Sequence, residues 1–270
     1  MNAGAFKALE QTGWGERADT YGLLTGRITT QLVEPLLDAA GVAAGKRVLD
    51  VGTGPGYAAA RASERGAAAT GVDIADEMVA LARRRNPGVH FLRADAEDLP
   101  FADGSFDAVV GNLVINHVPS PERVIRELAR VLAPQGAIAL STWDVPERNR
   151  FLGILLDALR ACGGAQPAAA GDPDPLRFAA EGEFRRLLSE AGFEDLEVRS
   201  VSLTQRVASA EELWEGMLGG SVRTAGLVMR EPPGTRREIR AAVERLAEEY
   251  RTGDGLSIPA RARIAAGRKP

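Results

Sequence analysis

The 270-residue chain has few of the residues that mark several large classes of protein. It has a single cysteine, Cys162, so no disulfide can form within the chain, and a reducing, cytoplasmic setting is expected. Basic residues are not in excess, because the net charge is -4 and the isoelectric point lies near 5.5. Nucleic acid is therefore not expected as a partner, since binding to phosphates needs a basic face. No cluster of cysteines and histidines has the spacing of metal ligands, so no metal is expected.

Long apolar runs are also missing. The segment FLGILLDAL is interrupted by Asp157, whereas a membrane-spanning helix needs about 20 mostly apolar residues. The N-terminal segment MNAGAFKALEQTGWGE lacks the apolar centre of a signal peptide, so no membrane partner is expected. The length and composition are those of a globular protein with a full-sized core.

The first half of the chain alternates between two kinds of segment. Short apolar segments predict strands, and the amphipathic segments between them predict helices. Strands are predicted at 47–52, 69–74, 89–95, 105–114 and 136–143, with helices at 57–66, 76–85 and 120–134. For the last of these helices, Ser120 is the expected N-cap, Pro121 suits the first position, and Pro134 is expected to end it. The alternation predicts an α/β fold with a parallel sheet covered by helices on both faces.

The flanking regions do not show this regular alternation. Residues 1–27 are expected to form a loose arm, 28–40 a helix, and the Gly-, Ala- and Pro-rich stretch 163–175 a loop. After residue 146 we expect further elements, namely helices at 151–161, 181–193, 210–219 and 235–251, a strand at 196–207 and a final edge strand at 256–269. The arginines of RTAGLVMREPPGTRREIR are expected on a solvated face, although one could meet an anionic substrate.

Three glycines stand between the first strand and the first helix, in the stretch VLDVGTGPGYA. They are Gly52, Gly54 and Gly56, and a glycine-rich turn lets a ligand approach the backbone beside the free N–H groups of a helix start. Asp73 and Asp95 end the second and third strands. The carboxyl ends of parallel strands meet at one edge of a sheet, where ligands bind near the topological switch point. We therefore expect one ligand site at this edge.

The glycine spacing distinguishes between two cofactors. A dinucleotide-binding loop of the form G-x-G-x-x-G would have its third glycine at the position of Tyr57, but the third glycine is Gly56. With Asp50 in front, the pattern D-x-G-x-G-x-G resembles motif I of class I methyltransferases that depend on S-adenosyl-L-methionine (SAM). The segments GVDIADEM, RADAEDLPF, GSFDAVVGNLVINHV and PERVIRELARVLAPQG extend this resemblance over roughly residues 40–143.

The resemblance implies a fold and a reaction. The fold would be a Rossmann-like, doubly wound, mostly parallel sheet with an antiparallel last strand and helical lid insertions. Residues 1–40 would form an arm and helix belonging to the lid, 41–145 the SAM-binding core, and 146–270 the lid helices with the last helix and strands of the core. The reaction would transfer a methyl group to an oxygen, nitrogen or carbon of a small-molecule acceptor, leaving S-adenosyl-L-homocysteine (SAH).

The resemblance also implies which residues bind the cofactor. Those that would pass under the methionine portion are Gly52, Thr53 and Gly54, those that would contact its polar end are Tyr21, Asn112 and Leu113, and Trp14 would help to close the pocket. Those that would meet the nucleoside are Asp73 at the ribose, Ile74 and Met78 against the adenine, and Asp95 and Ala96 at the adenine edge.

His117 follows the fourth strand, at the rim where an acceptor would lie. It could take a proton from the acceptor as a catalytic base, or it could only orient a loop. Other candidate acceptor contacts are the N-terminal arm, Asn116, Trp143, and the segments near Phe178 and Trp214, whereas His90 is interpreted as structural.

Three other functions remain as alternatives. The fold could carry out a rearrangement or cyclisation without methyl transfer, or bind SAM as a regulatory module. A nicotinamide-dependent dehydrogenase is disfavoured by Tyr57 and by the lack of a catalytic tyrosine–lysine pair. The identity of the acceptor, the atom methylated and the formation of a homodimer are not specified by any motif.

Overall fold

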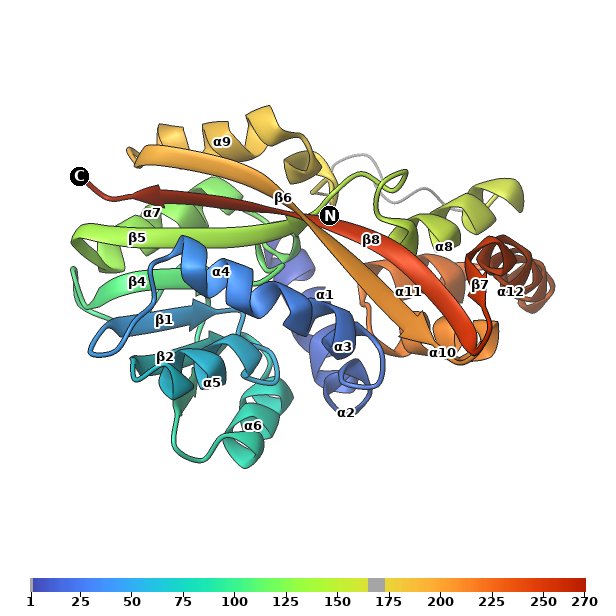
Figure 1. Ribbon diagram of the computed structural model, residues 1–270, viewed down its shortest axis with the longest axis horizontal. Helices are drawn as coiled ribbons and strands as arrows, with labels where there is room; N and C mark the ends of the chain where they lie inside the picture. The colour runs from blue at the N-terminus through green and yellow to red at the C-terminus, as the bar shows by residue number, and fades with distance from the viewer. Residues whose placement is uncertain (1, 165–172) are drawn as a thin grey trace.

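The computed structural model describes residues 2–164 and 173–270, and its strands form one mixed sheet (Figure 1). The order is β3-β2-β1-β4-β5-β8-β6, and the short β7 pairs with β8. The strands are β1 (Arg47–Val51), β2 (Ala68–Asp73), β3 (His90–Arg93), β4 (Phe106–Gly111), β5 (Leu132–Trp143), β6 (Glu194–Val207), β7 (Arg251–Thr252) and β8 (Gly255–Arg268). Strands β1 to β5 are parallel, and β8 runs antiparallel to both β5 and β6. The predicted mostly parallel sheet with an antiparallel last strand is confirmed.

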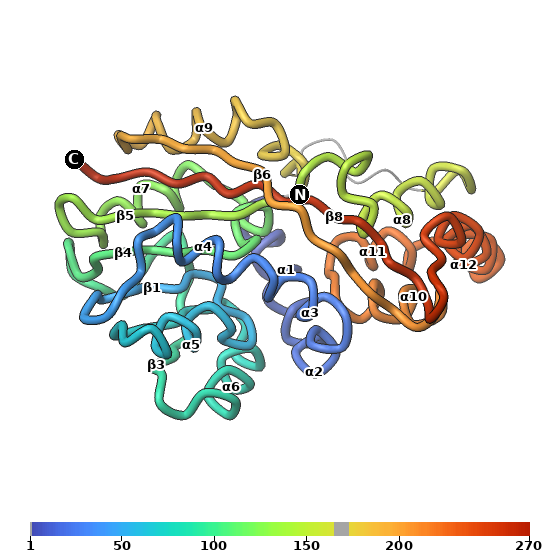
Figure 2. Tube along the Cα trace, in the orientation of Figure 1, coloured from blue at the N-terminus to red at the C-terminus, as the bar shows by residue number. Residues whose placement is uncertain are grey.

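Helices cover both faces of this sheet, as expected for strands that are buried on both sides. The helices of the first half are α1 (Ala3–Glu16), α2 (Ala18–Tyr21), α3 (Thr25–Thr29), α4 (Val33–Ala39), α5 (Tyr57–Glu64), α6 (Asp76–Arg85) and α7 (Pro121–Val131). Those of the second half are α8 (Arg150–Ala161), α9 (Glu181–Glu190), α10 (Ala210–Gly219), α11 (Arg223–Arg230) and α12 (Pro233–Ala247). Helices α4, α5 and α6 pack on one face, and α7 and α9 pack on the other (Figure 2).

The remaining helices gather beyond the end toward which β1 points (Figure 1). Helices α8, α10, α11 and α12 share an apolar core with the far ends of β6 and β8, built around buried side chains such as Leu155, Trp214 and Val243. The N-terminal helices α1 to α3 lie beside them. This group corresponds to the predicted helical insertions, and it places side chains from both ends of the chain over the carboxyl ends of the strands.

The N-terminal region is folded, so the prediction of a loose arm over 1–27 is wrong. Helix α1 begins after Asn2, whose side chain accepts a hydrogen bond from the Ala5 backbone N–H and so caps the helix. Phe6 and Glu10 on this helix are buried. The single helix predicted over 28–40 is also wrong, because a 3-10 turn at Thr30–Leu32 separates α3 from α4.

The last strand is not at an edge, contrary to the prediction for 256–269. Strand β8 lies between β5 and β6, and β6 is the edge strand. Pro259 had suggested an edge because it has no backbone N–H to give to a ladder. Strand β5 pairs with β8 only from Ala262 to Arg268, so Pro259 has only β6 beside it, where its partner is Thr204.

Two further expectations about local structure need correction. Pro134 does not end the helix predicted over 120–134, because α7 stops at Val131 and β5 starts at once, passing through Pro134. The arginine-rich segment contains an additional helix, α11, with buried Leu227 and Val228. The loop predicted over 163–175 falls largely on residues 165–172, outside the described residues. In the part of the chain that is described, no helix has the length and apolar character needed to cross a membrane.

The packing of β2 generates a prediction about stability. A Cβ atom added at Gly71 would lie 2.5 Å from Cδ1 of the buried Phe91 ring and 2.7 Å from the Thr53 hydroxyl oxygen. We expect Gly71→Ala to lower the free energy of unfolding by roughly 2 kcal/mol, because overpacking a close-packed core costs about that much. Urea unfolding would measure it. Gly88→Ala is the control, because an added Cβ there meets nothing within 4 Å, and equal losses in the two variants would contradict the prediction.

Candidate active site

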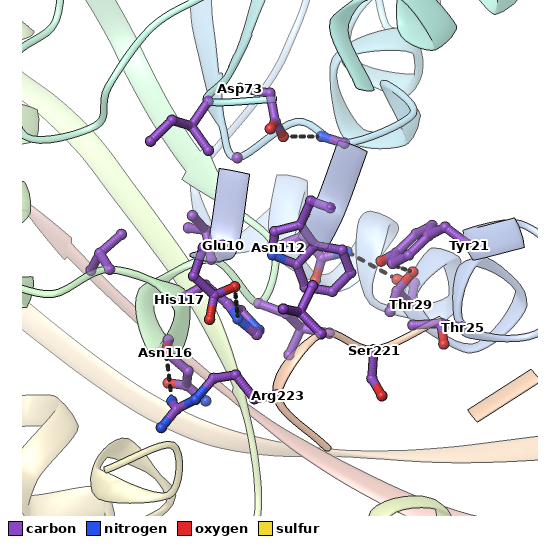
Figure 3. Close-up of a pocket in the computed structure, with 18 of the residues that line it drawn as sticks. Glu10, Tyr21, Thr25, Thr29, Asp73, Asn112, Asn116, His117, Ser221 and Arg223 are labelled. Carbon is purple, nitrogen blue, oxygen red and sulfur yellow. Dashed lines mark hydrogen bonds and ion pairs between the residues drawn. The ribbon is translucent and has the colours of Figure 1, made fainter. Parts of the chain in front are cut away.

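One large cavity lies where the strand ends meet the N-terminal and lid helices (Figure 3). It contains about 1530 Å³ of empty space, its open mouth included. It lies at the point where the strand order reverses between β1 and β4, the usual ligand site of such sheets. The residues predicted to bind a cofactor that line it are Tyr21, Gly52, Gly54, Asp73, Ile74, Met78, Asp95, Ala96, Asn112 and Leu113. His117, Trp14, Asn116 and Trp143 line it as well.

Asp73 connects two of the loops that form the floor of the cavity. Its Oδ2 accepts the backbone N–H of Gly54 at 2.8 Å (Figure 3), and its Oδ1 accepts that of Ala75 at 3.0 Å. Burial raises the pKa of this carboxyl, and the backbone N–H groups oppose the rise. A carboxylate has about four acceptor positions, so Asp73 can still accept hydroxyl groups of a ligand.

Two of the three glycines of the loop serve different purposes. Gly54 has a φ of +52°, and a Cβ added there would meet nothing within 4 Å, so its backbone borders open space in the cavity. Gly56 has a φ of +86° and precedes α5, but a Cβ added there would lie 2.8 Å from the ring of Phe91. The third glycine therefore makes room for a core phenylalanine rather than for a ligand.

Thr53 does not line the cavity. Its hydroxyl donates to Oδ2 of Asp50 at 2.6 Å, and the Ala59 backbone N–H donates to the same oxygen at 3.0 Å. Burial raises the pKa of Asp50 to about 7, although these two hydrogen bonds oppose the rise. Asp50, the first residue of the motif, thus connects the glycine loop to the first turn of α5.

Asp95 binds a side chain that was not predicted. Nζ of Lys7, on α1, lies 2.6 Å from Oδ2 of Asp95 and 2.8 Å from Oε2 of Glu97. Burial lowers the pKa of Lys7, but the hydrogen bonds and charges of the two carboxylates outweigh it and raise the pKa. This ion-pair cluster fastens the N-terminal helix to the loop after β3.

Tyr21 and Asn112 meet at Thr29 on another side of the cavity. The Tyr21 hydroxyl lies 3.1 Å from the Thr29 hydroxyl, and burial raises the pKa of Tyr21 to about 12. The Asn112 amide donates to the Thr29 carbonyl at 3.0 Å and accepts from the Ser141 hydroxyl at 2.7 Å. Leu113 has a φ of 62°, a conformation that is strained for a leucine and leaves its backbone beside the cavity.

One wall of the cavity is largely apolar. It includes Trp143, Phe151, Leu155 and Met217, from β5, α8 and α10. His117 also lines the cavity, with its Nδ1 at 3.1 Å from Oε2 of Glu10. The edge-to-face contact with Trp14 has a centroid distance of 5.1 Å.

The segments near Phe178 and Trp214 reach the main cavity through Pro175 and Met217. Phe178 itself lines a smaller neighbouring cavity, and Trp214 itself is in the core of the lid helices. Arg223, expected on a solvated face, lines the main cavity from α11, and its guanidinium donates to the carbonyls of Asn116 and Pro173. Among the described residues, no group of histidine, cysteine or acidic side chains could hold a metal ion.

Lys7 and Glu10 were missed because the helix that carries them was not predicted. Arg223 lies in the arginine-rich segment, for which contact of one arginine with an anionic substrate had been left open. Lys7, Glu10 and Trp14 have the spacing i, i+3, i+7, which places them on one face of a helix. This pattern would have indicated a functional face if the segment had been interpreted as helical.

Comparison with known proteins agrees with the fold. Residues 49–140 match the family model of the methyltransferase domain. A demethylmenaquinone methyltransferase of Beutenbergia cavernae is 37% identical over 181 residues, which is 62% of this chain and 73% of that protein. The chain belongs to the methyltransferase-domain family.

Solved structures extend the likeness of this methyltransferase-domain protein beyond the matched segment. A candidate methyltransferase of Bacillus halodurans has a TM-score of 0.58 at 21% identity, covering 88% of this chain and 98% of its own. The [4+2]-cyclase SpnF has a TM-score of 0.56 at 26% identity, covering 89% of this chain and 81% of its own. Most of the methyltransferase-domain protein, including the lid region, therefore has a counterpart in known folds.

The buried Asp50 predicts a pH dependence of stability. Its pKa rises from 3.8 to about 7 on folding, so the stability it contributes is full below the lower value and is lost as the pH rises through the higher one. Asp50→Asn keeps an oxygen to accept the two hydrogen bonds but does not titrate. Relative to this variant, the wild type should lose free energy of unfolding from about pH 4 to about pH 7.

Urea unfolding across this range would measure the difference. Asp76→Asn, the same change at the exposed start of α6, is the control. Parallel curves for the wild type and Asp50→Asn would contradict the prediction.

Proposed function

We propose that the protein transfers the methyl group of SAM to a small-molecule acceptor. The observation that carries the proposal is the single cavity to which four strand ends contribute. Gly54 follows β1, Asp73 ends β2, Asp95 follows β3 and Asn112 follows β4, and all of them line it. Membership of the methyltransferase-domain family supports the same conclusion.

The residues around the cavity fit SAM. The open backbone at Gly54 leaves room for the methionine portion to pass close to the chain, beside Gly52. The buried Asp73 carboxylate has acceptor capacity for the two ribose hydroxyls. Four other lining residues could bind the adenine. Ile74 and Met78 would cover its faces, and Asp95 and Ala96 would contact its edge.

The polar end of the methionine would lie on the Tyr21 side. The Tyr21 hydroxyl can donate to a carboxylate in place of its contact with Thr29. Both polar groups of the Asn112 side chain already have protein partners, so Asn112 and Leu113 would act mainly through their backbone.

SAM supplies a methyl group on a sulfonium, which is already electrophilic. The protein's own task is then to orient the acceptor and to exclude water. Trp143, Phe151, Leu155 and Met217 would hold an apolar acceptor. His117, which lines the same cavity, is the side chain we propose to take up the proton of the acceptor.

Different segments of the chain have different proposed roles. We propose that residues 41–145 bind the cofactor together with Tyr21, and that the rest of residues 1–40 and the lid helices within 146–270 choose the acceptor. The described part of one chain supplies side chains around the whole cavity, so the proposed reaction does not require a homodimer.

A second function is favoured by one specific observation. The cyclase SpnF is 26% identical to this chain and shares its fold across 89% of it. A cavity of this kind could therefore serve a rearrangement or cyclisation. Substrate turnover with SAH in place of SAM would support that function, whereas methyl transfer requires SAM.

The proposed cofactor is tested by calorimetric titration with SAM and, separately, with NAD. We expect SAM to bind and NAD not to bind. Asp73→Ala should weaken SAM binding at least about 30-fold, because it removes charge-assisted hydrogen bonds to the ribose. Asp76→Ala is the control, since this nearby carboxylate does not line the cavity.

Two outcomes of this experiment would contradict the proposal. NAD binding in preference to SAM would show that the cofactor is a dinucleotide. SAM binding without SAH formation on a broad panel of acceptors would leave binding without methyl transfer.

A further inference from the structure

Glu10 is a buried carboxylate whose hydrogen-bond partner is a histidine. The residue is 2% exposed, and its Oε2 lies 3.1 Å from Nδ1 of His117. Its other oxygen, Oε1, is buried and has no hydrogen-bond partner among the described residues. Within the same residues, no lysine or arginine forms an ion pair with it. Burial of a carboxylate destabilises the fold unless a hydrogen-bond or charge partner compensates for the lost hydration.

The contact with Glu10 decides which nitrogen of His117 carries the proton. A carboxylate accepts hydrogen bonds, so the neutral ring places its proton on Nδ1, toward Glu10. Nε2 then carries a free lone pair. In the described part of the chain Nε2 has no hydrogen-bond partner, and the His117 ring lies among the residues lining the cavity (Figure 3). The edge-to-face contact with Trp14 fixes the ring from another side.

The surroundings of His117 also limit the charge of the acceptor. Two cationic side chains line the cavity, and both have protein partners. Lys7 binds Asp95 and Glu97, and Arg223 donates to the carbonyls of Asn116 and Pro173 while its guanidinium lies over the Phe6 ring. The cavity wall formed by Trp143, Phe151, Leu155 and Met217 is apolar, so an uncharged acceptor fits it better than an anionic one.

The need for a base narrows the acceptor atom. A neutral amine can attack first and lose its proton to solvent afterwards. A hydroxyl group is a weak nucleophile until its proton is removed. The Nε2 lone pair of His117, held in place by the buried Glu10 carboxylate, is therefore best suited to an acceptor that reacts through a hydroxyl group.

We propose that Glu10 is a positioning residue that holds His117 with the Nε2 lone pair toward the acceptor, and that the acceptor is an uncharged, apolar molecule methylated on a hydroxyl oxygen. This rests on the proposed methyl transfer. The hydroxyl proton passes to Nε2, and the electron pair of the O–H bond forms the new bond from oxygen to the methyl carbon. The carbon–sulfur bond breaks with its pair remaining on sulfur, and the imidazolium faces Glu10 until its proton leaves to water.

The tautomer of His117 tests the role of Glu10 without an acceptor. The chain has two histidines, so nitrogen-15 spectra of the SAH-bound protein show two rings, with the exposed His90 as an internal reference. At a pH where both rings are neutral, we expect the proton of His117 on Nδ1. A proton on Nε2 of His117 would overturn the proposal.

Two variants separate positioning from packing. Glu10→Gln keeps a carbonyl oxygen that can accept from Nδ1, so it should preserve the tautomer. Glu10→Leu has no acceptor and should move the proton to Nε2, as in an exposed histidine, with SAH affinity within about threefold of the wild type. An unchanged tautomer in Glu10→Leu would contradict the proposal, and the wild-type spectrum remains decisive if this variant does not fold.

Two probes of the same ring shape test the acceptor class. In the SAH-bound protein, 2-naphthol should shift the Nε2 signal of His117 in a saturable way, and 2-naphthoate should not, because it is anionic. A saturable shift with 2-naphthoate alone, or no shift with either probe, would overturn the hydroxyl assignment. Failure of SAH to bind would instead refute the proposed function, so the two failures are distinguishable.

Discussion

The carboxylate of Asp73 is the contact on which the geometry of the cavity depends. It accepts the Gly54 N–H from the loop after β1 and the Ala75 N–H from the loop after β2, so it fixes the distance between two strand ends. Asp50, below the same loop, holds Thr53 and the start of α5. Two buried acids with raised pKa values are therefore built into the site, and their desolvation is offset by backbone and hydroxyl donors. A ligand that brings further donors to Asp73 would relieve part of this cost.

Most of the central fold could be predicted from local sequence patterns, because each strand and helix there has its own apolar periodicity and punctuation. The errors occurred where tertiary context decides. Helix α1 is weakly amphipathic in sequence and is stabilised by burial of Phe6 and Glu10. Pro259 suggested an edge strand. It lies in a part of β8 that extends beyond the end of β5, so no β5 residue pairs with it. Pro134 suggested a helix end, but the chain had already turned into β5.

The candidate site divides in the same way. The strand-end residues could be placed together because parallel topology brings carboxyl ends to one edge, whatever the details of packing. The partners of these residues could not be placed, since Lys7 reaches Asp95 across 88 positions and Glu10 reaches His117 across 107. Those contacts depend on how α1 docks, which no local pattern specifies. The same limit applies to Gly56, which serves Phe91 rather than a ligand. Whether the lining residues hold SAM in the proposed way stays a prediction.

A crystal structure of the protein with SAH tests the proposed binding mode most directly. SAH is expected in the main cavity, with both ribose hydroxyls on the Asp73 carboxylate, the adenine between Ile74 and Met78, and the sulfur on the side of His117. SAH bound in another orientation, with the ribose away from Asp73, would contradict this binding mode. So would a complex in which the sulfur faces away from the apolar wall formed by Trp143 and Phe151.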